Sequence, residues 1–121
     1  MPALEHYGIG LLPFFPLAHG LLTGKYRRGE SAPAGTRLAR DGFDKVLAAA
    51  PWDTIERLEA VGKERGVDLL AVAIGGLAAR PAVTSVIAGA TSAEQVRANV
   101  AAGSWVPTTE DRAAIEAALT A

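Results

Sequence analysis

Residues 8–26, GIGLLPFFPLAHGLLTGKY, decide how the rest of the chain is interpreted. They begin with an apolar run, Ile9–Phe15, which is bounded by glycine and proline and continues into a loop punctuated by glycines. An apolar run without alternation is typical of a strand that is buried on both faces. Pro13 cannot donate a hydrogen bond to a neighbouring strand, so it belongs at a bulge or at an open edge.

A second stretch, residues 85–99 (SVIAGATSAEQVRAN), has the same design of a strand followed by a loop. Val83–Ala88 is rich in β-branched residues, which predicts a strand. A turn follows, and the capping-box spacing of Ser92 and Gln95 predicts a helix over residues 93–102. Both stretches therefore place a loop at the end of a strand, where ligands bind in parallel α/β proteins.

Pro16–Arg40 is a long irregular stretch, and helical patterns occupy much of the remainder of the chain. They are indicated at Pro2–Tyr7, from Trp52 to Gly66, over Leu69–Arg80 and from Thr108 onward. The helix Leu69–Arg80, which Asp68 can cap, is apolar nearly all round, so it should be buried. Gly75 and Gly76 in its middle mark either a close backbone approach or plain decay of the sequence. The order of strand, helices, strand and helix implies parallel strands joined by a right-handed crossover, in one small α/β domain.

Composition narrows the class of protein. The 121 residues carry a formal net charge of -1, and this balance does not indicate a nucleic acid or an anionic membrane as partner. There are no cysteines, which excludes disulfides and thiolate metal sites, and the two histidines, His6 and His19, have no partner at ligand spacing. No targeting segment or membrane-spanning run is visible, so we expect a soluble, cytoplasmic protein without a metal.

The second loop has the features of an anion site. The backbone N–H groups of Gly89–Ser92 and the positive end of the following helix can hold a phosphate. Gln95 and Asn99 are four residues apart, so they share one helix face and can donate amide hydrogen bonds. A purely structural role in helix capping and strand–helix packing explains the same residues equally well.

The first loop offers cations and aromatic surface. Lys25 and Arg37 could bind phosphate, although a single basic residue in a loop is more often only solvated. Phe14 and Phe15 could lie against a ligand, although single aromatic residues more often belong to the core. From these residues alone, both alternatives remain open.

Three segments taken together are more specific: GLLPFFPLAHGLLTGKYRRGE, PAGTRLA and RPAVTSVIAGATSAEQVRANV. They resemble the C-terminal third of aldo-keto reductases, in the same order and over essentially the whole chain. The continuation G-A-T-x-x-x-Q-x-x-x-N is the most specific part. The resemblance implies the C-terminal part of a (β/α)8 TIM barrel, with about two parallel strands and four or five helices. Residues 1–121 would then be a partial aldo-keto reductase domain and an incomplete barrel.

The resemblance also implies a site for a nicotinamide dinucleotide. By position, an aromatic residue lies near the nicotinamide, a loop follows the pyrophosphate, basic residues fold over the cofactor, and a turn and helix hold the adenosine end. The aromatic position is Phe14, and the pyrophosphate loop is Phe15, Pro16, Leu17, Ala18 and Gly20. The basic positions are Lys25 and Arg37. The adenosine end is matched by Gly89, Ala90, Thr91, Gln95 and Asn99. Many members have a basic residue near position 91 for the 2′-phosphate of NADPH. Because Thr91 stands there, NADP(H) is expected and NAD(H) is not excluded.

The reaction implied by the resemblance is hydride transfer between NADPH and a small carbonyl substrate. The family uses a tyrosine acid, a lysine–aspartate pair and a histidine, and no segment here resembles the motifs that carry them. Tyr7, Tyr26, His6 and His19 therefore receive no catalytic role. A full barrel takes about 250 residues, so we expect a fragment that is inactive alone. The alternative is a non-catalytic nucleotide-binding or assembly module that self-associates through its open edge, or a truncated remnant.

Overall fold

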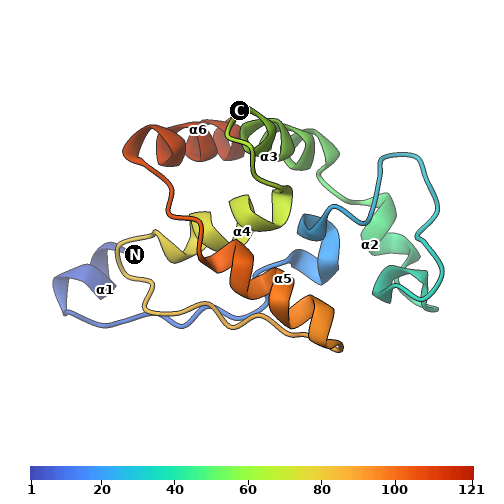
Figure 1. Cartoon of the computed structure of the whole chain (residues 1–121), viewed down its shortest axis with the longest axis horizontal. Helices are drawn as coiled ribbons and strands as arrows, with labels where there is room; N and C mark the ends of the chain where they lie inside the picture. The colour runs from blue at the N-terminus through green and yellow to red at the C-terminus, as the bar shows by residue number, and fades with distance from the viewer.

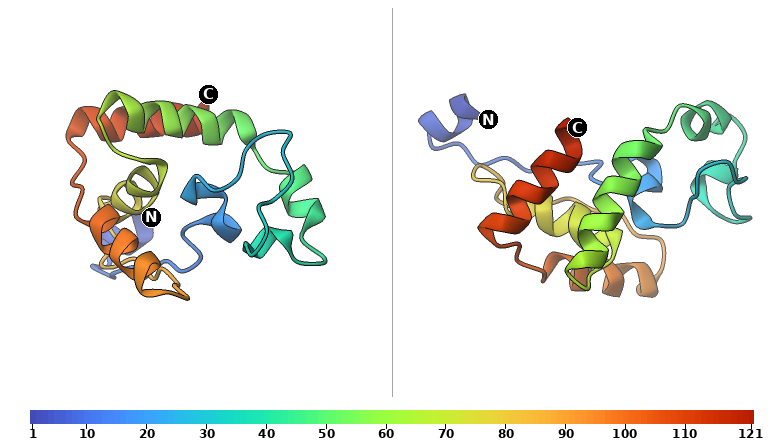
Figure 2. Two further views of the ribbon diagram at one scale, coloured as in Figure 1. Left: turned by 45° about the vertical axis from the view of Figure 1, so that its right-hand side comes forward. Right: turned by 90° about the horizontal axis from the view of Figure 1, so that it is seen from above.

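The computed structural model describes residues 1–121 and is mostly helical (Figure 1). The helices α3 and α6 lie side by side, α4 lies beneath them, and α5 packs against α4. Two extended segments run side by side below α4 in Figure 1, η1 packs against α4, and η2 and α2 form one end of the molecule (Figures 1 and 2). The elements are α1 (Pro2–His6), η1 (Ala18–Thr23), η2 (Arg37–Ala39), α2 (Asp44–Ala48), α3 (Trp52–Glu64), α4 (Leu69–Ala78), α5 (Ala93–Gly103) and α6 (Thr109–Thr120), where η denotes a 3-10 helix.

Two of the local signals for helix ends, Asp68 and Gly66, are confirmed. Asp68 Oδ1 accepts a hydrogen bond from the Ala71 N–H at 2.8 Å and starts α4. Gly66, with φ of 69°, follows the end of α3, as expected for a residue in the left-handed region. The short helix α2 has no side-chain cap, and no sequence pattern predicted it. No helix of the chain combines the length and the hydropathy that a membrane crossing requires.

The two predicted strands are not present as regular strands. Residues 9–15 and 83–88 instead meet through two isolated parallel bridges, Leu11 with Val83 and Phe14 with Ile87. The parallel direction agrees with the prediction, whereas continuous strand pairing does not. Here each extended segment pairs with the other segment only.

Pro13 explains why the pairing is interrupted. The Leu11 N–H donates to Ala82 O at 2.7 Å, and the Thr84 N–H donates to Leu11 O at 2.9 Å. The next ladder bond from the first segment would come from Pro13, which has no N–H. Phe14 follows Leu11 by three positions while Ile87 follows Val83 by four, so the second segment accommodates one extra residue between the bridges.

The expectation that these segments are buried on both faces is wrong. Leu12 is 55% exposed, Phe14 79% and Ile87 53%. Parallel strands are buried when helices and neighbouring strands cover both faces. In this chain the helices cover one side of the pair and no other segment covers the opposite side, so these side chains remain open.

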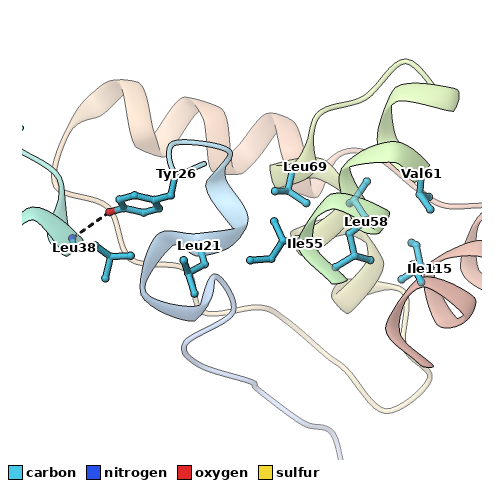
Figure 3. Close-up of a cluster of buried hydrophobic side chains, with 10 residues drawn as sticks. Leu21, Tyr26, Leu38, Ile55, Leu58, Val61, Leu69 and Ile115 are labelled. Atoms are coloured by element: carbon cyan, nitrogen blue, oxygen red, sulfur yellow. Dashed lines mark hydrogen bonds between the residues drawn. The ribbon is translucent and has the colours of Figure 1, made fainter. Parts of the chain in front are cut away.

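The core lies between α3, α4, α6 and η1 (Figure 3). As predicted, α4 is buried on most of its circumference. A Cβ added to Gly75 would lie 2.7 Å from Trp105 O, which shows that this glycine marks a close backbone approach. The buried residues of this cluster are Leu21, Tyr26, Leu38, Ile55, Leu58, Val61, Leu69, Val72, Ile115 and Ala118.

Candidate functional site

The two candidate loops begin at the same end of the extended pair. Phe14 and Ile87 form the last parallel bridge, and each segment then turns away into its own loop. Leu17 from the first loop and Ala88 from the second both pack against one small buried cluster, which consists of Leu70, Ala71, Ile74 and Ala102. The contacts with α4 and α5 therefore bring the starts of both loops to one side of the molecule.

The first loop has an unusual backbone. Phe15, Ala18 and His19 have φ of 61°, 48° and 61°, although none of them is glycine. Such conformations cost about 1–3 kcal/mol each and cluster at functional sites. The His19 ring makes edge contacts with Phe15 at 4.4 Å and with Phe43 at 5.6 Å between ring centroids. These aromatic contacts help to hold the loop in its strained shape.

Free backbone donors line both loops. In the first loop, the N–H groups of Leu17 and Ala18 have no acceptor within the chain. In the second, those of Gly89 and Ala90 are also free. Such groups, together with the N-terminus of α5, can bind a phosphate or pyrophosphate. Phe14 adds a largely exposed aromatic surface at the start of the first loop.

The second loop is held by the side chains of its own helix. Ser92 Oγ accepts from the Gln95 N–H at 3.2 Å, so Ser92 caps α5 as predicted. Gln95 does not complete a capping box: its Oε1 accepts from the N–H and the hydroxyl of Thr91, at 2.7 and 3.0 Å. Asn99 Nδ2 donates to Gly89 O at 3.4 Å. Gln95 and Asn99 thus share one face, as predicted, and both reach back to the loop.

The two predicted cations, Lys25 and Arg37, differ in their distance along the fold from the candidate loops. Lys25 and Arg37 are exposed and neither forms a salt bridge, so both charges are available to an anion. Lys25 comes after Gly24, the residue that caps η1, whereas Arg37 opens η2, which packs against η1 and α2. The structure therefore groups Lys25 with the first loop and places Arg37 beyond η1, away from α5 (Figure 1).

Two neighbouring arginines are already engaged and were not identified from the sequence. Arg28 donates from Nε and Nη2 to the two carboxylate oxygens of Glu56, both at 3.0 Å, and also contacts Asp53. Arg27 Nη1 donates to Glu59 at 2.8 Å. The Arg28 guanidinium lowers the pKa of Glu56 and of Asp53 through these hydrogen bonds. The acidic residues of α3 thus fix the segment after Lys25, which no local pattern reveals.

A buried tyrosine completes the support of the first loop and was also missed. The Tyr26 side chain is 3% exposed, and its hydroxyl accepts a hydrogen bond from the Leu38 N–H at 3.2 Å (Figure 3). Its ring lies against Gly20, where an added Cβ would be 3.4 Å from Cε2. Tyr26 therefore links η1 to η2 and has a structural role at the base of the loop.

The chain is similar in sequence to a known protein family and to several of its members. The chain matches the model of the Aldo/keto reductase family over residues 1–120. It is 36% identical over 111 residues to a probable voltage-gated potassium channel subunit beta of Arabidopsis thaliana, covering 88% of this chain and 34% of that protein. It is 36% identical over 108 residues to L-glyceraldehyde 3-phosphate reductase of Escherichia coli O157:H7, covering 84% and 31%.

A solved structure agrees with the sequence comparison. The glycerol dehydrogenase AKR11B4 from Gluconobacter oxydans superposes with a TM-score of 0.70 at 25% identity. The match covers 98% of this chain and 36% of that chain. The chain spans about a third of the length of the relatives that it matches. With a family match over nearly all of its residues, the chain belongs to the aldo/keto reductase family.

Proposed function

We propose that residues 1–121 form the part of an aldo/keto reductase domain that holds a nicotinamide dinucleotide. The complete site would serve a carbonyl/alcohol oxidoreductase, and this chain contributes binding groups without the catalytic side chains. One observation supports this most: two loops with free backbone N–H groups begin at the same end of a parallel pair. A dinucleotide needs hydrogen-bond donors at two separate places, along its pyrophosphate and at its adenosine end, and each loop can serve one of them.

In this proposal each loop has its own part of the ligand. Phe14 lies against the nicotinamide, and residues 15–20 follow the pyrophosphate, to which Leu17 and Ala18 offer free N–H groups. Lys25 supplies an exposed positive charge that no salt bridge engages, and Arg37 reaches the ligand only if η2 moves toward the loop. Gly89, Ala90, Thr91, Gln95 and Asn99 hold the adenosine ribose. The bound group supplies or accepts the hydride, and a small carbonyl compound is the substrate of the complete enzyme.

NADP(H) is proposed as the ligand, with NAD(H) as the alternative. Thr91 and Gln95 offer hydrogen bonds but no positive charge to a 2′-phosphate. One relative, 29% identical over 102 residues, is named NADH-specific methylglyoxal reductase of Escherichia coli. Both dinucleotides therefore belong in the same test.

The test is a titration of the isotope-labelled chain with NADP⁺ and with NAD⁺, followed by amide chemical shifts. We expect weak, saturable binding with shifts at residues 15–20 and 89–95. Lys25→Ala should weaken binding, while Lys45→Ala, an exposed lysine on α2 without a salt bridge, is the matched control. Titrations without shifts at either loop would exclude the proposed site, and submicromolar affinity would contradict a partial pocket.

A further inference from the structure

Three consecutive residues of the first loop, Ala18, His19 and Gly20, form a left-handed turn with φ of 48°, 61° and 92°. Only glycine adopts this region without strain, so the turn persists only where other contacts offset the strain at Ala18 and His19. The Gly20 N–H donates to Leu17 O at 2.9 Å and closes the turn. The free N–H groups of Leu17 and Ala18 belong to this turn, so its shape decides where these donors lie.

The His19 ring lies between two other aromatic rings. Its plane is inclined by 83° to that of Phe15 and by 67° to that of Phe43, at centroid distances of 4.4 and 5.6 Å. Edge-on pairs of this kind are favoured, because the positive edge of one ring meets the negative face of another. Phe43 directly precedes α2, and its side chain packs against the main core cluster. The three rings therefore connect the strained turn to the core.

These ring contacts are what the His19 side chain contributes to the structure. No salt bridge and no cluster of metal-ligating side chains includes His19. Without the ring contacts, the turn is held less firmly and the strained loop populates other conformations. A ligand that needs the left-handed turn then binds only the remaining fraction of molecules, and its apparent affinity falls by that fraction.

We propose that His19 and Phe43 are positioning residues for the dinucleotide. Phe43 fixes the His19 ring, and His19 fixes the turn that presents the N–H groups of Leu17 and Ala18 to the pyrophosphate. Neither side chain needs to touch the ligand. This inference rests on the function proposed above, and it adds that a residue outside both candidate loops sets part of the affinity.

The experiment follows amide chemical shifts of the isotope-labelled full chain, first free and then titrated with NADP⁺. His19→Asn is the main variant, because asparagine tolerates left-handed backbone but has no aromatic ring. It should shift the amides of Leu17 and Ala18 in the free chain and weaken the affinity about fivefold, which corresponds to about 1 kcal/mol of edge contact. Phe43→Leu, which keeps an apolar side chain against the core, should act in the same direction. The double variant should bind no more weakly than His19→Asn alone, since Phe43 acts through His19.

His6→Asn is the matched control. The His6 ring also makes an edge contact, with Tyr7 at 4.7 Å, but it belongs to α1, which lies well apart from η1 (Figure 1). This variant should leave the loop shifts and the affinity unchanged. If the unmodified chain does not bind NADP⁺, the proposed function fails together with the positioning role. If it binds and His19→Asn binds equally well, only the positioning role is overturned, as it also is if the two effects in the double variant simply add.

Discussion

Arg65 Nε donates a hydrogen bond to Asp111 Oδ1 at 2.7 Å and joins the end of α3 to the first turn of α6. The second oxygen of Asp111 accepts from the Thr108 N–H at 2.9 Å, and Thr108 Oγ1 accepts from the Asp111 N–H at 3.1 Å. One carboxylate therefore closes a capping box and also ties two helices together. The hydrogen bond from the Thr108 backbone, followed by the one from Arg65, lowers the pKa of Asp111.

This lowered pKa predicts a loss of stability in acid. The pKa of Asp111 in the folded chain lies below the usual aspartate value of about 3.9. The ionised Asp111 side chain therefore makes its full contribution to the stability of the fold above that pH. The contribution is lost as the pH falls through the folded pKa. Thermal unfolding followed by circular dichroism should show a falling melting temperature below about pH 4.

Asp111→Asn should lower the melting temperature at neutral pH and flatten its acid dependence. Asp41→Asn is the control, because Asp41 is exposed and forms no salt bridge. Arg28 lowers the pKa values of Asp53 and Glu56, so these two groups also make the chain less stable in acid. Both residues are unchanged in the two variants, so their effect is the same in each. If Asp111→Asn keeps the full acid dependence of the unmodified chain, the linkage assigned to Asp111 is wrong.

Tyr26→Phe should destabilise the chain by about 1 kcal/mol, because the buried Leu38 N–H loses its acceptor. The ring remains, so packing against η1 is retained. The free energy of unfolding from urea denaturation measures the effect. Tyr7→Phe, at a side chain that is 73% exposed, is the control and should change stability little. Equal effects of the two substitutions would show that the Tyr26–Leu38 hydrogen bond is unimportant.

Gly75→Ala should destabilise the chain by about 1–3 kcal/mol, since the added methyl group meets the Trp105 carbonyl oxygen at 2.7 Å. Gly103→Ala is the matched control in α5. There the new Cβ would lie 3.7 Å from Ile74 Cγ2, an ordinary contact, so this substitution should be neutral or slightly stabilising. Denaturation curves for the two variants test the close approach of α4 to the segment after α5. If Gly75→Ala leaves the free energy of unfolding unchanged, the two segments are not in close contact at this position.

The chain by itself should reduce no carbonyl compound. We expect this because the resemblance implies that the catalytic tyrosine, lysine–aspartate pair and histidine belong to motifs that no segment of this sequence resembles. The measurement is the loss of NADPH absorbance with a panel of aldehydes and ketones, with a complete aldo/keto reductase as positive control. Sustained turnover by a contaminant-free sample would contradict the prediction.

Local signals allowed the sequence to determine where α4, α5 and α6 begin. Asp68, Ser92 and Thr108 cap α4, α5 and α6 through hydrogen bonds that span three residues, so the residues themselves reveal them. The two apolar runs were identified as a parallel pair, which the bridges confirm in direction. Both candidate loops were also identified, because they follow directly from those runs.

The tertiary structure alone decided what those elements touch. Whether an apolar run is buried depends on the elements that cover it, so the sequence could not reveal that Leu12, Phe14 and Ile87 are exposed. The same holds for Arg28, which finds Glu56 on a helix 28 residues later, and for Tyr26, which finds Leu38. Local hydrogen bonds are encoded within a few residues of chain. Contacts between distant segments exist only once the whole chain has packed.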